Sequence, residues 1–304
     1  MRFSTITSLA IAIAPLAVSA APGSLGFSLG TKKADGSCKH QADYESDFKL
    51  ISAASGAKIV RGYSCSDCNA AQYMLPAAKS QGFQVILGVW PDVETSFSAD
   101  KKAISTYATK YADQVYAITT GSESLYRGNF TGEELLSKIQ EIKALVKGTN
   151  IKVGTADSWN KFADGTANAI IKANVDILLV NAFGFWQGQD ISNATHQYFD
   201  DVMQAYTHIA AMGGGEIEVW NGETGWPSDG GSDFSAAIAG TENAKTYFRQ
   251  AVCGMLGWGF NVFLFEAFDE PWKPHSVGEN GLAADETHWG AMTADGKSKF
   301  PLKC

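Results

Sequence analysis

Eight short, apolar segments recur along the chain, and most of the intervals between them leave room for a helix. Three of them, residues 84–90, 176–183 and 261–265, are almost continuously hydrophobic, which is typical of parallel strands buried on both faces. The other five strand candidates are residues 25–29, 58–63, 115–120, 151–155 and 216–220. This alternation predicts parallel strands joined by helical crossovers.

The longer segments between the strands have helical periodicity. Residues 131–146 open with Thr131 and Glu134, which form a capping-box pattern, and then place apolar residues on one stripe. The other predicted helices are residues 43–54, 99–112, 199–212 and 243–256. About 280 residues with this alternation predict a single (β/α)₈ TIM barrel, an α/β fold of roughly 250 residues. The alternative is a doubly wound open sheet, but no Gly-rich phosphate loop follows the first strand.

Residues 1–20 have the pattern of a secretory signal peptide. Arg2 precedes an apolar run at 6–16, and small residues lead up to Ala20. A buried first helix is the alternative reading of this segment. We therefore expect a signal peptide at 1–20 and one barrel domain at 21–304. No later apolar run is long enough to span a membrane and the C-terminus is polar, so the chain is expected to be secreted.

Charge and histidine spacing exclude several kinds of partner. The chain has 24 Lys and Arg against 32 Asp and Glu, a net charge of -8, which argues against nucleic acid or an anionic membrane. The 5 His show no ligand spacing, so we expect no metal and no cofactor.

Asn129 and Asn193 lie in Asn-x-Thr triplets that accept glycans in secreted proteins. We expect a monomer.

Two glutamates follow strands at positions that suit glycosidic bond cleavage. In a TIM barrel the chemistry takes place at the carboxyl ends of the strands, and Glu123 follows the fourth strand and Glu223 lies just after the seventh. Cleavage needs one protonated carboxyl for the leaving oxygen and one ionised carboxyl for the developing cation. The alternative for each glutamate is a solvated residue at the rim. Other polar residues that follow strands are Tyr63, Asp92 and Asp157.

The stretch 217–228, which contains Gly222-Glu223-Thr224-Gly225-Trp226-Pro227, resembles the signature of glycoside hydrolase family 17, the β-1,3-glucanases. Much of the remaining chain is similar to the fungal cell-wall branch of that family, the yeast Bgl2-like glucanosyltransferases. The matching stretches follow one another in order over nearly the whole mature chain: 25–27, 66–69, 87–91, 121–127, 154–160, 181–189 and 265–273.

The resemblance implies a role for each matching carboxylate. Glu223 corresponds to the nucleophile of a retaining double displacement, and Glu123 to the general acid/base. In a retaining mechanism the two carboxyls lie roughly 5–5.5 Å apart. The negative charge of Glu223 would then help to raise the pKa of Glu123. Glu270 and Lys273 correspond to a Glu-x-x-Lys pair near the reacting sugar, although a surface ion pair would explain the same spacing.

The substrate implied by the resemblance is β-1,3-glucan or laminari-oligosaccharides, that is, polysaccharide of the cell wall. Ser122 occupies the position where plant members have an Asn that holds the sugar 2-hydroxyl, and Asn181 is a candidate substitute. Three tryptophans could stack on sugar rings or pack at the rim: Trp186, Trp226 and Trp272. Two other functions stay open: a non-catalytic glucan-binding wall protein, and a barrel hydrolase of another β-glycan such as cellulose or mannan.

Five cysteines remain after the signal peptide, and an odd number leaves at least one unpaired in an oxidising compartment. Cys65-x-x-Cys68 could be a redox motif or half of a zinc site, but the secretory context favours a structural disulfide. We predict the pairs Cys38–Cys68 and Cys253–Cys304, which join neighbouring loops and fix the C-terminus. The choice of Cys68 over Cys65 follows the resemblance.

Overall fold

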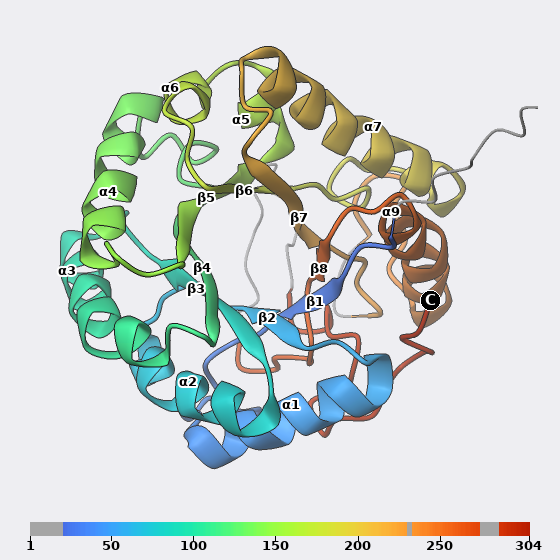
Figure 1. Ribbon diagram of the computed structural model, residues 1–304. Coiled ribbons are helices and arrows are strands. Elements are labelled where there is room, and N and C mark those ends of the chain that lie inside the picture. Colours follow the sequence, from blue (N-terminus) through green and yellow to red (C-terminus); the bar gives the residue numbers. More distant parts are fainter. Residues whose placement is uncertain (1–20, 230–232, 274–285) are drawn as a thin grey trace, which may run out of the picture.

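The computed structural model describes residues 21–229, 233–273 and 286–304, so the predicted signal peptide at 1–20 lies outside the described residues. Eight parallel strands form a closed barrel in sequence order, with β1 paired to β8 (Figure 1). This closure excludes the open doubly wound sheet and confirms the (β/α)₈ barrel. The strands are β1 Leu25–Ser28, β2 Ile59–Arg61, β3 Gln84–Val89, β4 Val115–Ser122, β5 Lys152–Ser158, β6 Ile177–Asn181, β7 Glu218–Thr224 and β8 Val262–Leu264.

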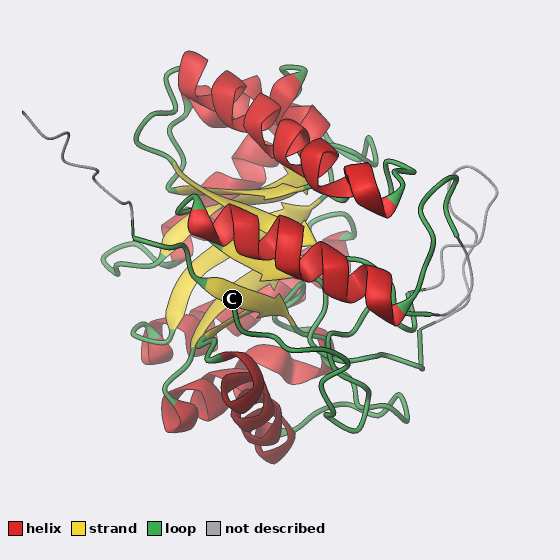
Figure 2. Ribbon diagram, turned by 90° about the vertical axis from the view of Figure 1, so that its right-hand side faces the viewer, coloured by secondary structure: helices red, strands yellow, loops and turns green. Residues whose placement is uncertain are grey.

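Helices cover the outside of the barrel on all sides (Figures 1 and 2). The α-helices are α1 Gln41–Ser55, α2 Ala70–Gln81, α3 Glu94–Ala103, α4 Gly132–Leu145, α5 Trp159–Ala163, α6 Asn168–Lys172, α7 Ile191–Ala211, α8 Thr241–Tyr247 and α9 Cys253–Gly257. The π-helical segments are Ile104–Ala108 after α3 and Phe248–Val252 between α8 and α9, and short 3₁₀ turns lie at Asp67–Asn69 and Thr109–Tyr111.

The predicted helices exist, but some of their boundaries differ. The capping box of α4 is confirmed, since the Glu134 backbone N–H donates to Thr131 Oγ1 at 3.2 Å and the Thr131 N–H donates to Glu134 Oε2 at 2.7 Å. Helix α7 begins eight residues before the predicted start, because Asp190 caps it through the Ser192 N–H at 2.9 Å. Helix α2 was not predicted, and it contains Pro76, a residue that usually interrupts helices.

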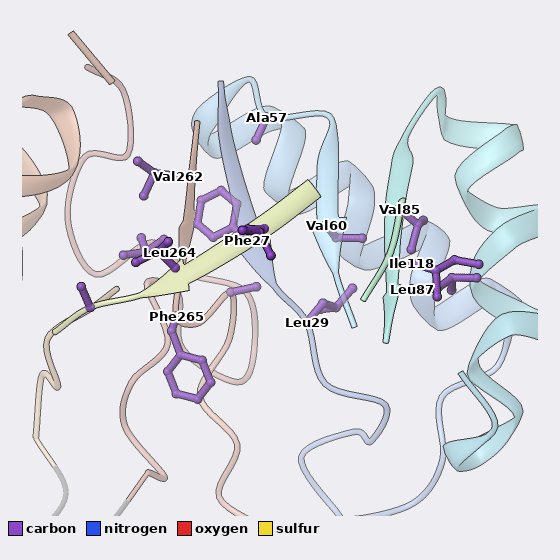
Figure 3. Close-up of a cluster of buried hydrophobic side chains, with 14 of the residues drawn as sticks. Phe27, Leu29, Ala57, Val60, Val85, Leu87, Ile118, Val262, Leu264 and Phe265 are labelled. Atoms are coloured by element: carbon purple, nitrogen blue, oxygen red, sulfur yellow. The ribbon is translucent and has the colours of Figure 1, made fainter. Parts of the chain in front are cut away.

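The hydrophobic residues form two separate clusters. The larger cluster lies between the strands and the helices; Figure 3 shows part of it, with Phe27 of β1, Val60 of β2 and Leu264 of β8. The smaller cluster fills the barrel interior with Ile59, Ile86, Ala117, Ala156, Ile177, Leu179, Trp220 and Phe263. Arg61 and Asn181, two residues after Ile59 and Leu179, lie at the carboxyl ends of β2 and β6, where the candidate site is.

Two strands extend beyond their predicted ends through bulges. The pairing of β4 with β5 shifts between Thr119 and Ser122, and the pairing of β7 with its neighbours shifts around Gly222. An inserted residue reverses the inward and outward alternation of a strand. Trp220 faces the interior, so without the shift Glu223 would point outward; with it, Glu223 occupies an inward position.

Both predicted disulfides are present. Cys38 and Cys68 are bonded with their Cα atoms 5.3 Å apart, and Cys253 and Cys304 with their Cα atoms 5.4 Å apart. The first joins the loops after β1 and β2, and the second holds the C-terminal residue against α9. Cys65 is a buried free thiol, as predicted. In the described part of the chain, no helix is both long and apolar enough to cross a membrane.

Candidate active site

Glu123 and Glu223 lie at the same end of the barrel, on opposite sides of Asn181 and Arg61. Glu123 directly follows β4 and has a left-handed backbone, with φ of 60°, which is uncommon for a residue other than glycine. Its backbone N–H donates to the Ala156 carbonyl at 3.0 Å. Glu223 is the sixth residue of β7 and is 8 % exposed. The structure therefore places both predicted catalytic carboxyls in one largely buried site.

Arg61 joins the two carboxyls. Its side chain is fully buried at the end of β2, and Nη1 lies 3.0 Å from Glu223 Oε1. Nη1 also donates to the Asn181 Oδ1 at 3.3 Å, and the Asn181 Nδ2 donates to Glu123 Oε1 at 3.1 Å. Among the residues that the structure describes, Glu223 has a cation as its partner, whereas Glu123 accepts a hydrogen bond from a neutral amide.

Burial raises the pKa of both glutamates above the usual carboxyl range. It raises the pKa of Glu223 to about 7, while the Arg61 charge opposes the rise and the Glu123 charge adds to it. It also raises the pKa of Glu123, where the Asn181 hydrogen bond opposes the rise and the Asp157 charge adds to it. The predicted direction for Glu123 is confirmed, but its main causes are burial and Asp157 rather than Glu223.

Ser122 and Asn181 are both placed beside the carboxyls. Arg61 Nη2 donates to Ser122 Oγ at 3.0 Å, so the Ser122 hydroxyl keeps its own proton for a further partner. Asn181 uses its oxygen toward Arg61 and its nitrogen toward Glu123, and it is 1 % exposed. The Ser122 proton and the second N–H of the Asn181 amide are the donors that these contacts leave for a sugar hydroxyl.

Lys273 lies among three carboxylates beside β8. Its Nζ is 2.8 Å from Glu266 Oε1, 3.1 Å from Glu270 Oε2 and 3.4 Å from Glu286 Oε2. The Glu270 and Lys273 side chains are 7 % and 15 % exposed, so the alternative of a surface ion pair is wrong. Burial raises the pKa of Glu266 well above its usual range, and the Glu270 charge adds to this. The three carboxylates raise the pKa of Lys273 although burial opposes them.

The three tryptophans differ in their surroundings. Trp226 is 4 % exposed, its ring contacts Phe185 and Tyr247, and its Nε1–H donates to the Ile238 carbonyl at 2.9 Å. It is therefore a packing residue, which corrects its assignment as a sugar platform. Trp186 and Trp272 are only half-buried. Trp186 stacks on Trp289 at 5.3 Å, and Lys32 Nζ lies 4.6 Å from the centroid of the Trp272 ring.

Sequence reasoning missed Arg61 and did not assign a role to Glu266. The signal for Arg61 was a charged residue at the end of a short apolar strand whose other residues are Ile59 and Val60. A charged side chain in a buried strand is rare unless it has a partner, and here the partner is Glu223. The signal for Glu266 was the position directly after the last apolar strand.

The barrel and the paired buried carboxyls at its mouth define a glycoside hydrolase. Residues 26–290 match the family model of the BtgE/BtgC glycoside hydrolase domain, so the chain belongs to this family, which lies within glycoside hydrolase family 17 as predicted. The chain is similar to the glucan 1,3-beta-glucosidase of Arthroderma benhamiae, with 56 % identity over 306 residues, 100 % of this chain and 98 % of that protein. It is also similar to the glucan 1,3-beta-glucosidase of Saccharomyces cerevisiae, with 40 % identity over 319 residues, 100 % of this chain and 99 % of that protein.

A solved structure agrees with this assignment. The glycoside hydrolase family 17 β-1,3-glucanosyltransferase from Rhizomucor miehei superimposes with a TM-score of 0.77 and 29 % sequence identity, covering 92 % of this chain and 97 % of that one. An active-site mutant of the same enzyme, in complex with laminaritriose, superimposes with a TM-score of 0.78 and 28 % identity, covering 92 % and 98 % of the two chains.

Proposed function

We propose that this glycoside hydrolase is secreted and acts on the β-1,3-glucan of a fungal-type cell wall by a retaining double displacement. The names of its relatives support the substrate, because two are glucan 1,3-beta-glucosidases and one related structure holds laminaritriose. The signal-peptide pattern at 1–20 and the glycan acceptors Asn129 and Asn193 support secretion into the wall.

The observation that carries the mechanism is the 3.0 Å contact between Arg61 and Glu223. A cation beside a carboxyl favours its ionised form, so Glu223 is suited to be the nucleophile. The pKa values of both glutamates are raised, so the contacts distinguish them: Glu123 has a neutral amide beside it instead of a cation and is therefore suited to hold the proton. Glu223 attacks the anomeric carbon while Glu123 protonates the departing oxygen, which leaves a glycosyl ester on Glu223 and an ionised Glu123.

In the second step, Glu123 takes a proton from the acceptor hydroxyl. The acceptor oxygen attacks the anomeric carbon, the ester bond breaks, and Glu223 returns to its ionised form. The anomeric carbon of the product therefore has the stereochemistry that it had in the substrate. Water as acceptor gives hydrolysis, and a glucan hydroxyl gives chain transfer. The relationship to both a glucosidase and a glucanosyltransferase supports each outcome.

We assign substrate contacts to the polar and aromatic side chains around the two carboxyls. Ser122 would donate its free proton to the sugar 2-hydroxyl, while Asn181 holds Glu123. Glu270 and Lys273 would bind hydroxyls of the neighbouring sugar, since they form a largely buried ion pair in the segment that follows β8. The half-buried rings of Trp186 and Trp272 would stack on sugar faces.

The test is to incubate the protein with a laminari-oligosaccharide reduced at one end and to separate the products by size. Products longer than the substrate show transfer, and only shorter products show hydrolysis. Glu223→Gln is the matched inactive control, since it keeps the size of the side chain but removes the charge. Unchanged product formation by Glu223→Gln would contradict the assignment of the nucleophile. If the protein turned over oligosaccharides of cellulose or mannan but not laminari-oligosaccharides, the proposed substrate would be wrong.

A further inference from the structure

The loop that carries Glu123 is held in place by two carboxylates from neighbouring strands. Residues 123–129 form a tight turn in which the Arg127 N–H donates to the Glu123 carbonyl at 2.9 Å. Asp157, at the end of β5, accepts the backbone N–H groups of Leu125 at 2.8 Å and Tyr126 at 3.1 Å. Such bonds are needed because the left-handed backbone of Glu123 is unfavourable unless its surroundings fix it.

Asp92, which follows β3, fixes the side chains of the same loop. Its Oδ1 accepts a hydrogen bond from Ser124 Oγ at 2.6 Å. Its Oδ2 accepts hydrogen bonds from Arg127 Nη2 at 2.7 Å and from Asn129 Nδ2 at 2.7 Å. The Asp92 side chain is only 7 % exposed, although its partners Arg127 and Asn129 are themselves exposed. One buried carboxylate thus binds three residues of the loop that presents Glu123.

Arg127 carries the constraint from Asp92 to the residue before Glu123. Its Nη2 donates to the Asp92 carboxylate and also to the Ser122 carbonyl at 2.6 Å. The guanidinium lies 4.9 Å from the centroid of the Trp90 ring, which covers one of its faces. The Arg127 charge also favours ionisation of Glu123. The orientation of Arg127 therefore affects both the backbone before Glu123 and the charge near it.

We propose that Asp92 is a positioning residue for the acid/base Glu123, acting through Arg127 and the 123–129 loop. The inference rests on the proposed function, because it assigns Asp92 a role in the reaction step that Glu123 performs. It also gives Asn129 a structural part: the amide of this predicted glycan acceptor is bonded to Asp92, so the acceptor lies in the loop beside the active site.

The charge of Asp92 sets the direction of the expected pH effect. The charged groups facing Glu123 are Asp157 of β5, Arg127 of its own loop, Arg61 of β2 and Glu223 of β7. In Asp92→Asn, the negative charge that pairs with Arg127 is removed. The uncompensated Arg127 cation favours ionisation of Glu123, so the proton needed for catalysis is lost at a lower pH.

The experiment compares two substrates whose leaving groups differ in their need for an acid. Laminaripentaose requires protonation of its departing oxygen, whereas 2,4-dinitrophenyl β-laminaribioside does not, because dinitrophenolate is a stable anion. We expect Asp92→Asn to lower kcat/KM for laminaripentaose by about 10- to 100-fold and for the dinitrophenyl glycoside by less than about 3-fold. The alkaline limb of the pH profile for laminaripentaose moves to lower pH.

Two further variants complete the design. Arg127→Met removes the cation, so the same alkaline limb should move to higher pH, the opposite direction from Asp92→Asn. Glu141→Gln is the matched control, because Glu141 also forms an ion pair at 2.8 Å, with Lys101, but on the outer helices. It should leave both substrates and the pH profile unchanged.

The outcomes separate this inference from the proposed function. If the wild-type enzyme turns over neither substrate, the proposed function fails and the inference with it. If the wild type is active and Glu123→Gln loses laminaripentaose turnover, but Asp92→Asn behaves as wild type, only the role of Asp92 is overturned. If Asp92→Asn lowers kcat/KM equally for both substrates and leaves the alkaline limb unchanged, the role of Asp92 is also overturned. A residue that only stabilises the fold would give this result. If circular dichroism shows that Asp92→Asn is unfolded, the pH profile of Arg127→Met decides. An alkaline limb at higher pH supports the inference, and an unshifted limb overturns it.

Discussion

Arg61 Nη1 lies 3.0 Å from Glu223 Oε1, and both side chains are almost entirely removed from solvent. An ion pair in this position has a large effect because water does not screen it. Without Arg61, the burial that already raises the pKa of Glu223 would act unopposed except for the hydrogen bond from Tyr63. The pair therefore opposes the effect of burial, so that the pKa of the proposed nucleophile is about 7.

We predict that Arg61→Met moves the acid limb of kcat/KM to higher pH. The limb reports ionisation in the free enzyme, where Glu223 must be charged to attack. Loss of the cation raises the pKa of Glu223, so a higher pH is needed to ionise it, and turnover below neutral pH falls by at least about 100-fold. The measurement is a pH series of kcat/KM on a laminari-oligosaccharide.

Arg61→Lys is the control for charge. It keeps a cation but loses the second donor, which reaches Ser122. We expect reduced activity with an acid limb close to that of the wild type. A folded Arg61→Met variant whose acid limb coincides with that of the wild type would contradict the role given to the pair.

The barrel was predictable from sequence, while the geometry of the site was only partly so. Strands buried on both faces are marked by apolar runs, which located all eight. The apolar runs of β4 and β7 end at Thr120 and Trp220, and the bulges that follow contain Gly121 and Gly222. A bulge depends on pairing with the neighbouring strands, so the pattern within one strand does not reveal it.

The partners of the predicted residues were the other missing part. Glu270 and Lys273 have a spacing that fits a surface ion pair equally well, and only the fold shows that Glu266 and Glu286 surround the same ammonium group. Trp226 lies in the strongest sequence motif, yet its ring packs against Phe185. Composition and spacing identify which residue types are present, but burial in the folded chain decides which of these side chains can contact a substrate.

A second prediction concerns Gly30, which lies just after β1 and beside Glu270. A Cβ at this position would lie 1.8 Å from Glu270 Oε1, a distance that no real contact allows. Gly30→Ala therefore requires a shift of the Glu270 carboxylate, whose Oε2 contacts Lys273, or of the backbone at residue 30. We expect KM for laminari-oligosaccharides to rise about 10-fold or more, with a smaller change in kcat, since Glu270 is proposed to bind the substrate rather than react.

The matched control for Gly30→Ala is Gly215→Ala, because a Cβ at Gly215 meets nothing within 4 Å. Steady-state kinetics and thermal melts of both variants give the comparison. Gly215→Ala should match the wild type in both measurements. If Gly30→Ala also kept the wild-type KM, Glu270 would have no part in binding.

The disulfide between Cys253 and Cys304 gives a prediction for stability. It closes a separation of 51 residues, for which the chain-entropy model expects about 4 kcal/mol. Cys253→Ser should therefore lower Tm by several degrees, because the C-terminal segment can separate from α9. Cys65→Ala is the comparison, since it removes a buried thiol that forms no disulfide. A thermal melt in which Cys253→Ser is as stable as the wild type would contradict the prediction.

Asp201 of α7 is fully buried and forms no ion pair with any residue that the structure describes, so its ionisation should weaken the fold. Burial raises the pKa of Asp201 to about 6, against 3.8 for a free aspartate, although the Gln197 hydrogen bond at 2.8 Å opposes this. The folded state then binds the proton more tightly than the unfolded state. Stability is lost as the pH rises from about 4 to about 6, by on the order of 3 kcal/mol, and the loss is complete above that range.

Asp201→Asn removes this titration, whatever its effect on stability at a single pH. Urea unfolding at a series of pH values should show the variant gaining stability relative to the wild type between about pH 4 and 6, with a constant difference above. Asp200→Asn, which changes the adjacent exposed aspartate, should shift the wild-type curve only slightly, because the Asp200 charge is the smallest of the causes that act on the pKa of Asp201. A difference between Asp201→Asn and the wild type that stayed constant from pH 4 to 7 would show that Asp201 ionises equally easily in the folded and unfolded chains.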